Sequence, residues 1–224
     1  MRLCKFSTKL DHWRPLIEGW WDVMDHYVKV SRGDLPYWWN EAGNVSFFAA
    51  AAWKIGGVAI QEYCVDRGQE RPSKGRSDLR LHIPRLALEC AIEAKVNWAT
   101  NVETVLKDVR ASISQASGQL KALRKDACRA PVGIALCFVC PLVRSSLDGQ
   151  PIFKGLLHAF ESERGVDPVF LAVYEPPVGV QLEDEDSTYG KYFYPGVALW
   201  GQVVWGAEES LRENSEAAQI VPPS

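Results

Sequence analysis

Polar and apolar positions alternate along residues 86–96, whose sequence is LALECAIEAKV. One parity of this run is apolar throughout, and the other parity carries Glu89, Glu93 and Lys95. Alternation with a period of two predicts a strand that packs one face on a core. The opposite face would then hold Glu93 and Lys95 as neighbours near the end of the strand. A solvated surface ion pair gives the same pattern, so the meaning of the pair depends on the elements around it.

Periodicity and turn residues predict the other elements. Apolar residues at helical spacing predict helices at 8–30, 44–55, 102–125 and 151–164. Apolar and β-branched runs predict strands at 58–67, 78–83, 84–96, 130–143, 168–175 and 196–205. Asn44 is the expected N-cap of the second helix, which Gly56 and Gly57 are expected to end. Residues 68–77 are predicted to form a basic loop, and residues 182–190 an acidic, solvated loop.

The composition is ordinary for a soluble globular protein. The chain has 224 residues, of which 47% are hydrophobic and 24% are charged, so it can bury a substantial core. We expect an N-terminal helical segment at 1–37, a main domain at 38–206 and a mobile tail at 207–224. The formal net charge is −3, so any binding of nucleic acid has to rest on local basic patches.

Tryptophan is concentrated near the N-terminus. Five of the nine Trp residues fall within the first 39 positions, namely Trp13, Trp20, Trp21, Trp38 and Trp39. Large aromatic side chains mostly serve burial, which favours a helical packing unit over a platform that stacks bases. A homodimer interface or a surface for a protein partner is the alternative use of this segment.

The chain contains six Cys, and only Cys137 and Cys140 lie close together in the sequence. A single C-x-x-C without a second pair or nearby His is weak evidence for zinc. Because the spacing is odd, strand alternation predicts these thiols on opposite faces, where they would neither share a zinc ion nor bond to each other. The first residues lack the apolar run of a signal peptide, and the longest apolar run, before Lys54, is too short to span a bilayer. We therefore expect a reduced, cytoplasmic setting without a membrane.

Acidic residues on consecutive strands are predicted to converge. Asp78 begins the strand at 78–83, and Glu93 and Lys95 lie on the next strand, its expected hairpin partner. Adjacent antiparallel strands can bring an Asp on one strand beside a Glu and a Lys on the other. Two carboxylates placed in this way offer the hard oxygen ligands that Mg²⁺ prefers. A Lys beside them can hold or deprotonate a water molecule and offset charge on a phosphate.

These motifs resemble those of the PD-(D/E)xK nuclease superfamily. SDLRL, at 77–81, is similar to the acidic element, with Ser77 where Pro is common, and EAK, at 93–95, is similar to the E-x-K element. QASGQL, at 115–120, resembles the Gln-bearing helix that follows the third strand in many members. NEAGNVSFFAAAAW, at 40–53, resembles the first core helix, where a Glu often completes the site. The resemblance spans about residues 38–140.

The resemblance implies an α/β fold with a restriction endonuclease-like αβββαβ core, in which helices flank a central mixed sheet. It implies an enzyme that hydrolyses phosphodiester bonds of nucleic acid, with DNA as the expected substrate. Mg²⁺ would be the cofactor, and Mn²⁺ would substitute for it because the ligands are hard oxygens. Two alternatives stay open, since a fold does not fix a function. One is a catalytically silent binding or regulatory module, and the other is a scaffold that binds a protein partner.

The resemblance also implies roles for individual residues. The implied metal ligands are Asp78 and Glu93, completed by Glu41 or alternatively by Glu62. Lys95 would position the attacking water. Residues that would orient Lys95 or contact a phosphate are Gln115 and Gln119, which lie four apart on one helical face.

Basic residues near these motifs are candidates for contacts with phosphates. They are Arg71, Lys74, Arg76, Lys107 and Arg110. Cations in loops and on helix surfaces are more often simply solvated, and the sequence leaves that alternative open.

Overall fold

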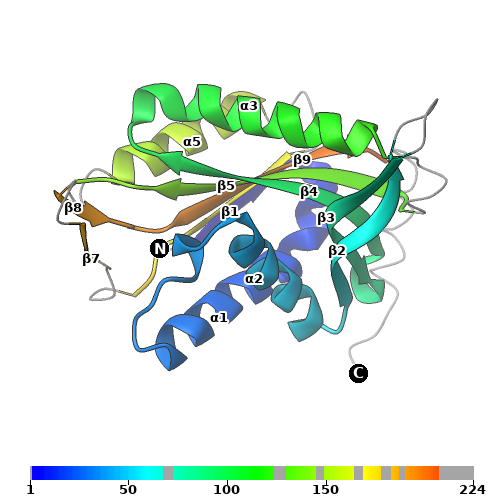
Figure 1. Ribbon diagram of the computed structural model, residues 1–224, viewed down its shortest axis with the longest axis horizontal. Helices are drawn as coiled ribbons and strands as arrows, with labels where there is room; N and C mark the ends of the chain where they lie inside the picture. The colour runs from blue at the N-terminus through cyan, green and yellow to red at the C-terminus, as the bar shows by residue number, and fades with distance from the viewer. Residues whose placement is uncertain are drawn as a thin grey trace.

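A mixed sheet of seven strands forms the centre of the molecule, and helices cover both of its faces (Figure 1). The computed structural model describes residues 2–67, 73–123, 130–144, 149–163, 169–177, 183–186 and 190–206. Across the sheet the strands lie in the order β1-β6-β9-β5-β4-β3-β2. Their bounds are β1 (Arg2–Phe6), β2 (Val58–Arg67), β3 (Ser73–Ile83), β4 (Leu88–Ala99), β5 (Val132–Pro141), β6 (Val169–Tyr174) and β9 (Val197–Trp205). Among these described strands, β4 and β5 pair in parallel and the other neighbours pair antiparallel.

The helices form a layer on each side of the sheet. One layer contains α1 (Arg14–Val30) and α2 (Glu41–Lys54), and the other contains α3 (Val102–Lys121) and α5 (Gly149–Glu163). Short 3₁₀ turns lie at η1 (Thr8–Trp13), η2 (Pro36–Trp38) and η3 (Pro84–Leu86). None of the described helices is long and apolar enough to cross a membrane.

Each helical layer encloses its own buried apolar cluster. β5 runs between the two clusters, and every one of its residues is buried. A strand covered on both faces needs apolar side chains on both parities, which explains the uninterrupted apolar run VGIALCFVC. β5 therefore anchors the middle of the sheet, and β4, its parallel neighbour, is held against it over ten residue pairs.

The predicted succession of helix, three strands, helix and strand is present as α2, β2, β3, β4, α3 and β5. β2, β3 and β4 form an antiparallel meander. α3 then crosses over the sheet and returns the chain to β5, parallel to β4, as a parallel pair requires. The mixed α/β architecture with a central sheet flanked by helices is thus confirmed.

The N-terminal segment differs from the prediction of one helix over 8–30. Residues 2–6 form β1, which pairs with β6 at the edge of the main sheet, and η1 precedes α1, which begins only at Arg14. Residues 1–37 are therefore not purely helical. α1 packs in the same buried cluster as α2 and the sheet. β1 was not predicted because its partner strand, β6, lies far along the chain, where local periodicity does not reveal it.

Three further segments differ from the prediction. α2 begins at Glu41 with Asn40 as its N-cap, whereas the predicted cap, Asn44, is buried inside the helix. β3 begins at Ser73, so residues 73–77 of the predicted basic loop are strand. The predicted acidic loop at 182–190 contains the strand β7 (Glu183–Asp186), which pairs with β8 (Gly190–Phe193) in a separate two-stranded sheet.

The tryptophans of the N-terminal segment mainly fill the core. Trp13, Trp20 and Trp21 are buried in the cluster between the helices α1 and α2 and the sheet. Trp38 is partly buried against the same cluster, and Trp39 is exposed. The interpretation of this segment as a packing unit is confirmed for the buried residues.

The predicted placement of the thiols on β5 is confirmed. Cys137 belongs to the cluster under α3 and α5, and Cys140 belongs to the cluster under α1 and α2. Both are free thiols, and the Cys140 Sγ contacts the backbone oxygen of Tyr37 at 3.4 Å. The sheet itself lies between the two sulfur atoms, so they cannot share a ligand.

The cap of α2 yields a test of the fold. The Asn40 side chain accepts a hydrogen bond from the amide of Gly43 at 3.0 Å, and it satisfies an amide that the helix itself leaves open. Asn40→Ala should lower the free energy of unfolding by about 1 kcal/mol, measured by urea denaturation. Asn40→Asp keeps an acceptor at the cap and should retain most of the stability. Equal losses in both variants would contradict the capping role.

Candidate active site

The pairing between β3 and β4 ends midway along β3. Their pairing runs from Ile83↔Leu88 to Leu79↔Ile92, although β3 itself begins at Ser73. In the part of the chain that the structure describes, no strand pairs with this edge of β4 beyond Ile92. We call this point, where β3 leaves β4, the fork.

A local backbone irregularity in β2 accompanies the fork. Glu62 has a φ of 50°, a left-handed conformation that is uncommon for residues other than Gly. It is skipped in the ladder between Gln61↔Leu79 and Tyr63↔Ser77. Ala59 and Val65 are six positions apart, so in a regular strand their side chains would lie on the same face. Instead, Ala59, before Glu62, packs on the cluster beneath α1 and α2, and Val65, after Glu62, belongs to the cluster beneath α3. The hairpin thus changes face at Glu62.

Past this irregularity the hairpin curls towards α3. Arg67, the last residue of β2, forms an isolated bridge with Leu123, just beyond the end of α3. Figure 1 shows the β2–β3 hairpin rising beside the end of that helix. The end of the hairpin therefore lies beside the C-terminal end of α3.

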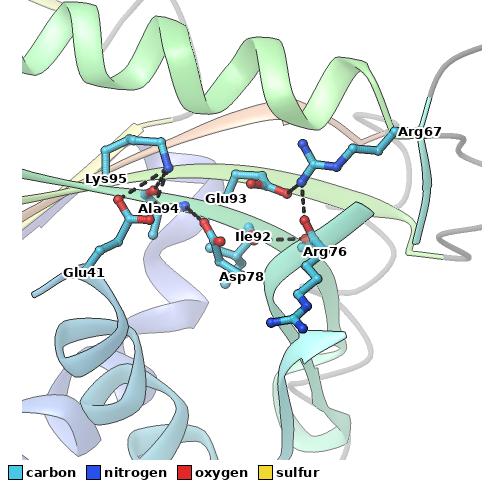
Figure 2. A network of polar contacts seen from close by, with 9 residues as sticks. Glu41, Arg67, Arg76, Asp78, Ile92, Glu93, Ala94 and Lys95 are labelled. Carbon is cyan, nitrogen blue, oxygen red and sulfur yellow. Dashed lines mark hydrogen bonds and ion pairs between the residues drawn. The ribbon is translucent and has the colours of Figure 1, made fainter. Parts of the chain in front are cut away.

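Side-chain carboxylates accept hydrogen bonds from backbone amides at the free edge of β4. The Asp78 Oδ2 accepts a hydrogen bond from the amide of Ala94 at 2.7 Å (Figure 2). Two residues further along, the backbone of Val96 makes a hydrogen bond to the Glu41 carboxylate. Backbone amides that lose their strand partner need another acceptor, and here two acidic side chains from β3 and α2 supply it.

Glu93 lies buried beside the fork. Only 1% of its side chain is exposed, and its Oε1 accepts a hydrogen bond from the Arg67 Nη2 at 2.9 Å. The pKa of Glu93 is raised to about 7, mainly by burial and in addition by the negative charge of Asp78. Arg67, the hydroxyl of Ser77 and Lys95 oppose that rise. The charge of Asp78 acts on the pKa of Glu93, so the two carboxylates lie close enough to interact electrostatically.

Lys95 is held between a helix and its own strand. Its Nζ lies 3.2 Å from the Glu41 Oε1 and also donates to the backbone oxygen of Ala94. Its side chain is 14% exposed, compared with 38% for Glu41. Burial raises the pKa of the Glu41 carboxyl, and Lys95 partly offsets this effect. Lys95 therefore adjoins the same free edge of β4 that Asp78 and Glu41 occupy (Figure 2).

A pocket of about 260 Å³ opens beside Asp78. Its polar lining comes from α2, β2 and β3 and consists of Asn40, Glu41, Gln61, Glu62 and Asp78. Glu62 also forms an ion pair with Arg76, at 3.4 Å. The structure thus brings both candidate third ligands, Glu41 and Glu62, to one pocket together with Asp78.

The donor set suits a hard divalent cation. Carboxylate oxygens are what Mg²⁺ prefers, and a buried acid with a raised pKa beside other acids gains from an added positive charge. As the side chains stand, the described residues contain no group of three or more His, Cys, Asp or Glu side chains arranged to hold a metal ion. Ligation would require Glu93 or Glu41 to exchange its present cationic partner for the metal.

The two predicted glutamines of α3 differ in their surroundings. Gln115 is exposed, whereas the Gln119 Oε1 is buried and has no hydrogen-bond partner among the described residues. Ser112, seven residues before Gln119 and hence on the same side of the helix, hydrogen-bonds to Cys137, which pairs with Lys95 across β4 and β5. Gln119 is therefore better placed than Gln115 to face the fork.

The predicted phosphate contacts fall into separate groups. Lys74 and Arg76 lie exposed on the β2–β3 hairpin beside the fork, where Lys74 pairs with Asp66 at 2.7 Å. Lys107 is exposed on α3, and Arg110 lines another pocket between α3 and β9. Arg71 lies outside the described residues.

Two residues of the site were not predicted from the sequence. Arg67 ends the predicted strand at 58–67 and had no assigned role, and in the structure it is the partner of Glu93. Ser77, fully buried, donates to the backbone oxygen of Ile92 at 3.3 Å and hydrogen-bonds to Glu93. No local pattern identifies either contact, because both depend on the turn of the hairpin at Glu62.

No family model, curated protein or solved structure matches the chain.

Glu93 makes stability depend on pH in an unusual direction. In the metal-free protein its carboxyl holds a proton up to a pKa of about 7, compared with an ordinary value of 4.5. Between those values the folded protein keeps a proton that the unfolded chain has released, so a rise in pH favours unfolding. We expect this group to lower the free energy of unfolding by roughly 2–3 kcal/mol between about pH 5 and pH 8.

Urea denaturation in EDTA across this pH range measures the effect, and Glu93→Gln is the matched variant because an amide does not titrate. The stability of Glu93→Gln relative to the wild type should rise as the pH rises. A difference that stays constant with pH would contradict the raised pKa.

Proposed function

We propose that the chain is a Mg²⁺-dependent nuclease that hydrolyses phosphodiester bonds, with DNA as the expected substrate. One observation carries the proposal: Asp78, Glu93 and Lys95 meet at the free edge of β4, where Glu41 contacts Lys95. Carboxylates beside a Lys provide both a place for a hard cation and a group that handles water.

The topology supports the same proposal. The order α2, β2, β3, β4, α3, β5, with β4 parallel to β5, is the order that the resemblance to the PD-(D/E)xK superfamily implies. The acidic element lies on β3 and the E-x-K element on β4, again in keeping with that resemblance. We therefore propose that the mixed sheet with its flanking helices is a restriction endonuclease-like core.

In the proposed reaction, Asp78 and Glu93 hold the metal, with Glu41 or Glu62 as a further ligand. When bound, Mg²⁺ supplies positive charge that lowers the pKa of a coordinated water and offsets charge on the phosphate. Lys95 orients the attacking water through its ammonium group, which is fixed at present by Glu41 and by the backbone oxygen of Ala94.

Binding of the substrate would rest on a local patch, because the net charge of the chain is −3. Lys74 and Arg76 project from the hairpin with 82% and 71% of their side chains exposed. Both are paired with acids across that hairpin, Asp66 and Glu62, at distances of 2.7 and 3.4 Å. Exposed pairs of this kind are weak, so a phosphate can replace the acid as the partner of the cation.

The roles of Lys95 and Asp78 can be separated by mutation. Lys95→Ala should lower the rate of DNA cleavage by roughly 10²-fold or more and leave metal binding in place, because an ammonium group offers no lone pair to a metal. Lys95→Arg should not restore cleavage, because the broad, planar guanidinium group cannot take the position of the compact ammonium group that orients the water. Asp78→Asn should lose cleavage and metal affinity together, because it removes a ligand charge. Nicking of circular DNA with Mg²⁺ or Mn²⁺ and titration calorimetry with Mn²⁺ measure the two effects.

Lys29→Ala is the control, since Lys29 is exposed on α1, on the opposite side of the sheet from α3. It should keep the activity of the wild type. Cleavage by Lys95→Ala at nearly the rate of the wild type would refute the role of Lys95.

A second candidate function has some structural support. Glu93 is paired with Arg67, and Glu41 is paired with Lys95, so the charges at the fork are already largely satisfied within the chain. Such a network also suits a catalytically silent module that binds nucleic acid or a partner. If the wild type cleaves neither circular nor linear DNA with either metal, this second function replaces the first.

A further inference from the structure

Arg67 occupies a special position at the fork. Its Nη2 donates both to the Glu93 Oε1, at 2.9 Å, and to the backbone oxygen of Arg76. The guanidinium group reaches Glu93 from the end of β2, 26 positions away in the sequence. Figure 2 shows it approaching from the hairpin, on the side of Glu93 away from Lys95.

Gly75 makes room for this approach. A Cβ at Gly75 would lie 2.6 Å from both the Cδ and the Nε of Arg67, which is closer than side chains tolerate. Gly75 pairs with Val65 on the neighbouring strand, so the Arg67 side chain crosses β3 over the one residue there that has no side chain. Any larger residue at position 75 would push the guanidinium away from Glu93.

The charge on Glu93 needs a positive partner. Its side chain is 1% exposed and lies near the charge of Asp78, and an unpaired carboxylate in such a place is costly. Arg67 supplies the positive charge in the protein as it stands. A divalent cation would supply the same charge and would claim the same Oε1, so the guanidinium and the metal compete for one oxygen.

Arg67 is only partly fixed in its place. Its side chain is 23% exposed, and its Nε is buried without a hydrogen-bond partner among the described residues. It lies on the hairpin that has already left β4. A buried donor without an acceptor weakens the present arrangement, so the guanidinium group can leave Glu93 at a modest cost.

We propose that Arg67 is a positioning residue that holds the cation position at Glu93 until a divalent metal displaces it, and that the freed guanidinium then binds a phosphate of the nucleic acid. The proposal rests on the proposed nuclease function, whose site it deepens. A guanidinium group suits the second task because its planar donors match two phosphate oxygens at once. Arrival of the metal would thereby prepare the site for its substrate.

A purely structural role for Arg67 would change the metal affinity in the opposite direction. If it only fastens the hairpin to β4, its removal should loosen the site and weaken metal binding. If it competes with the metal, its removal should tighten metal binding. The sign of the change in metal affinity therefore distinguishes these roles.

The main experiment is titration of the full chain with Mn²⁺ by calorimetry at neutral pH. Arg67→Ala should bind Mn²⁺ about tenfold more tightly than the wild type, because one charged hydrogen bond no longer competes. Gly75→Ala changes no charge but displaces the guanidinium, so it should shift the affinity in the same direction. Arg85→Ala is the matched control: it removes one exposed cation from the turn at the other end of β3 and should leave the affinity unchanged.

Thermal unfolding provides a readout that does not depend on activity. In EDTA, Arg67→Ala should unfold at a lower temperature than the wild type, because Glu93 has lost its partner. Saturating Mn²⁺ should raise the midpoint of the variant more than that of the wild type, because the metal takes the place of the missing cation.

The kinetics of cleavage test the contact between Arg67 and the phosphate. At saturating Mn²⁺, Arg67→Ala should raise the KM for DNA by about tenfold with a smaller change in kcat.

Each outcome decides the matter. If the wild type binds Mn²⁺ and cleaves DNA, but Arg67→Ala and Gly75→Ala bind Mn²⁺ equally well or more weakly, the competition is overturned and the nuclease function stands. If only the variants bind Mn²⁺, the competition is supported and the wild type is a silent module. If no form binds Mn²⁺ or cleaves DNA, both proposals are overturned. Should Arg67→Ala fail to fold, Gly75→Ala gives the same decision.

Discussion

The loss of strand pairing between β3 and β4 is the feature on which the rest of the site depends. Up to Leu79 and Ile92 the two strands satisfy each other's backbone; beyond that point the amides of β4 need other partners. Asp78 and Glu41 provide acceptors there. Acidic side chains are thereby drawn to one short stretch of strand edge, and a polar site arises in the middle of a largely apolar sheet.

This origin accounts for the charge balance of the site. Carboxylates that gather along a strand edge repel one another, and burial adds to the penalty. Lys95 and Arg67 offset that penalty, one from β4 itself and the other from the far end of β2. The acids of the site therefore require positively charged partners. The ion pairs mainly offset the cost of burying these acids, since buried ion pairs add little net stability to the fold.

The surrounding layers give the fork its rigidity. β5 is buried along its whole length, and β4 is paired to it up to Ala99, beyond Glu93 and Lys95. α3 packs against both strands, and α2 brings Glu41 from the other face. The β2–β3 hairpin contributes the parts with more exposure, including Lys74 and Arg76.

The sequence by itself determined the elements whose pattern is local. Alternation over 86–96 predicted β4, with Glu93 and Lys95 on one face. The apolar run of β5 and the helical spacing of α3 predicted those two elements equally well. The opposite faces of Cys137 and Cys140 followed from the odd spacing alone. Only the tertiary structure decided that residues 2–6 join the sheet beside residues 169–174, and that Asn40 rather than Asn44 caps α2. It also decided that Arg67 reaches Glu93, because that contact depends on one left-handed residue, Glu62, turning a hairpin onto its other face. Side-chain periodicity carries no record of such a turn.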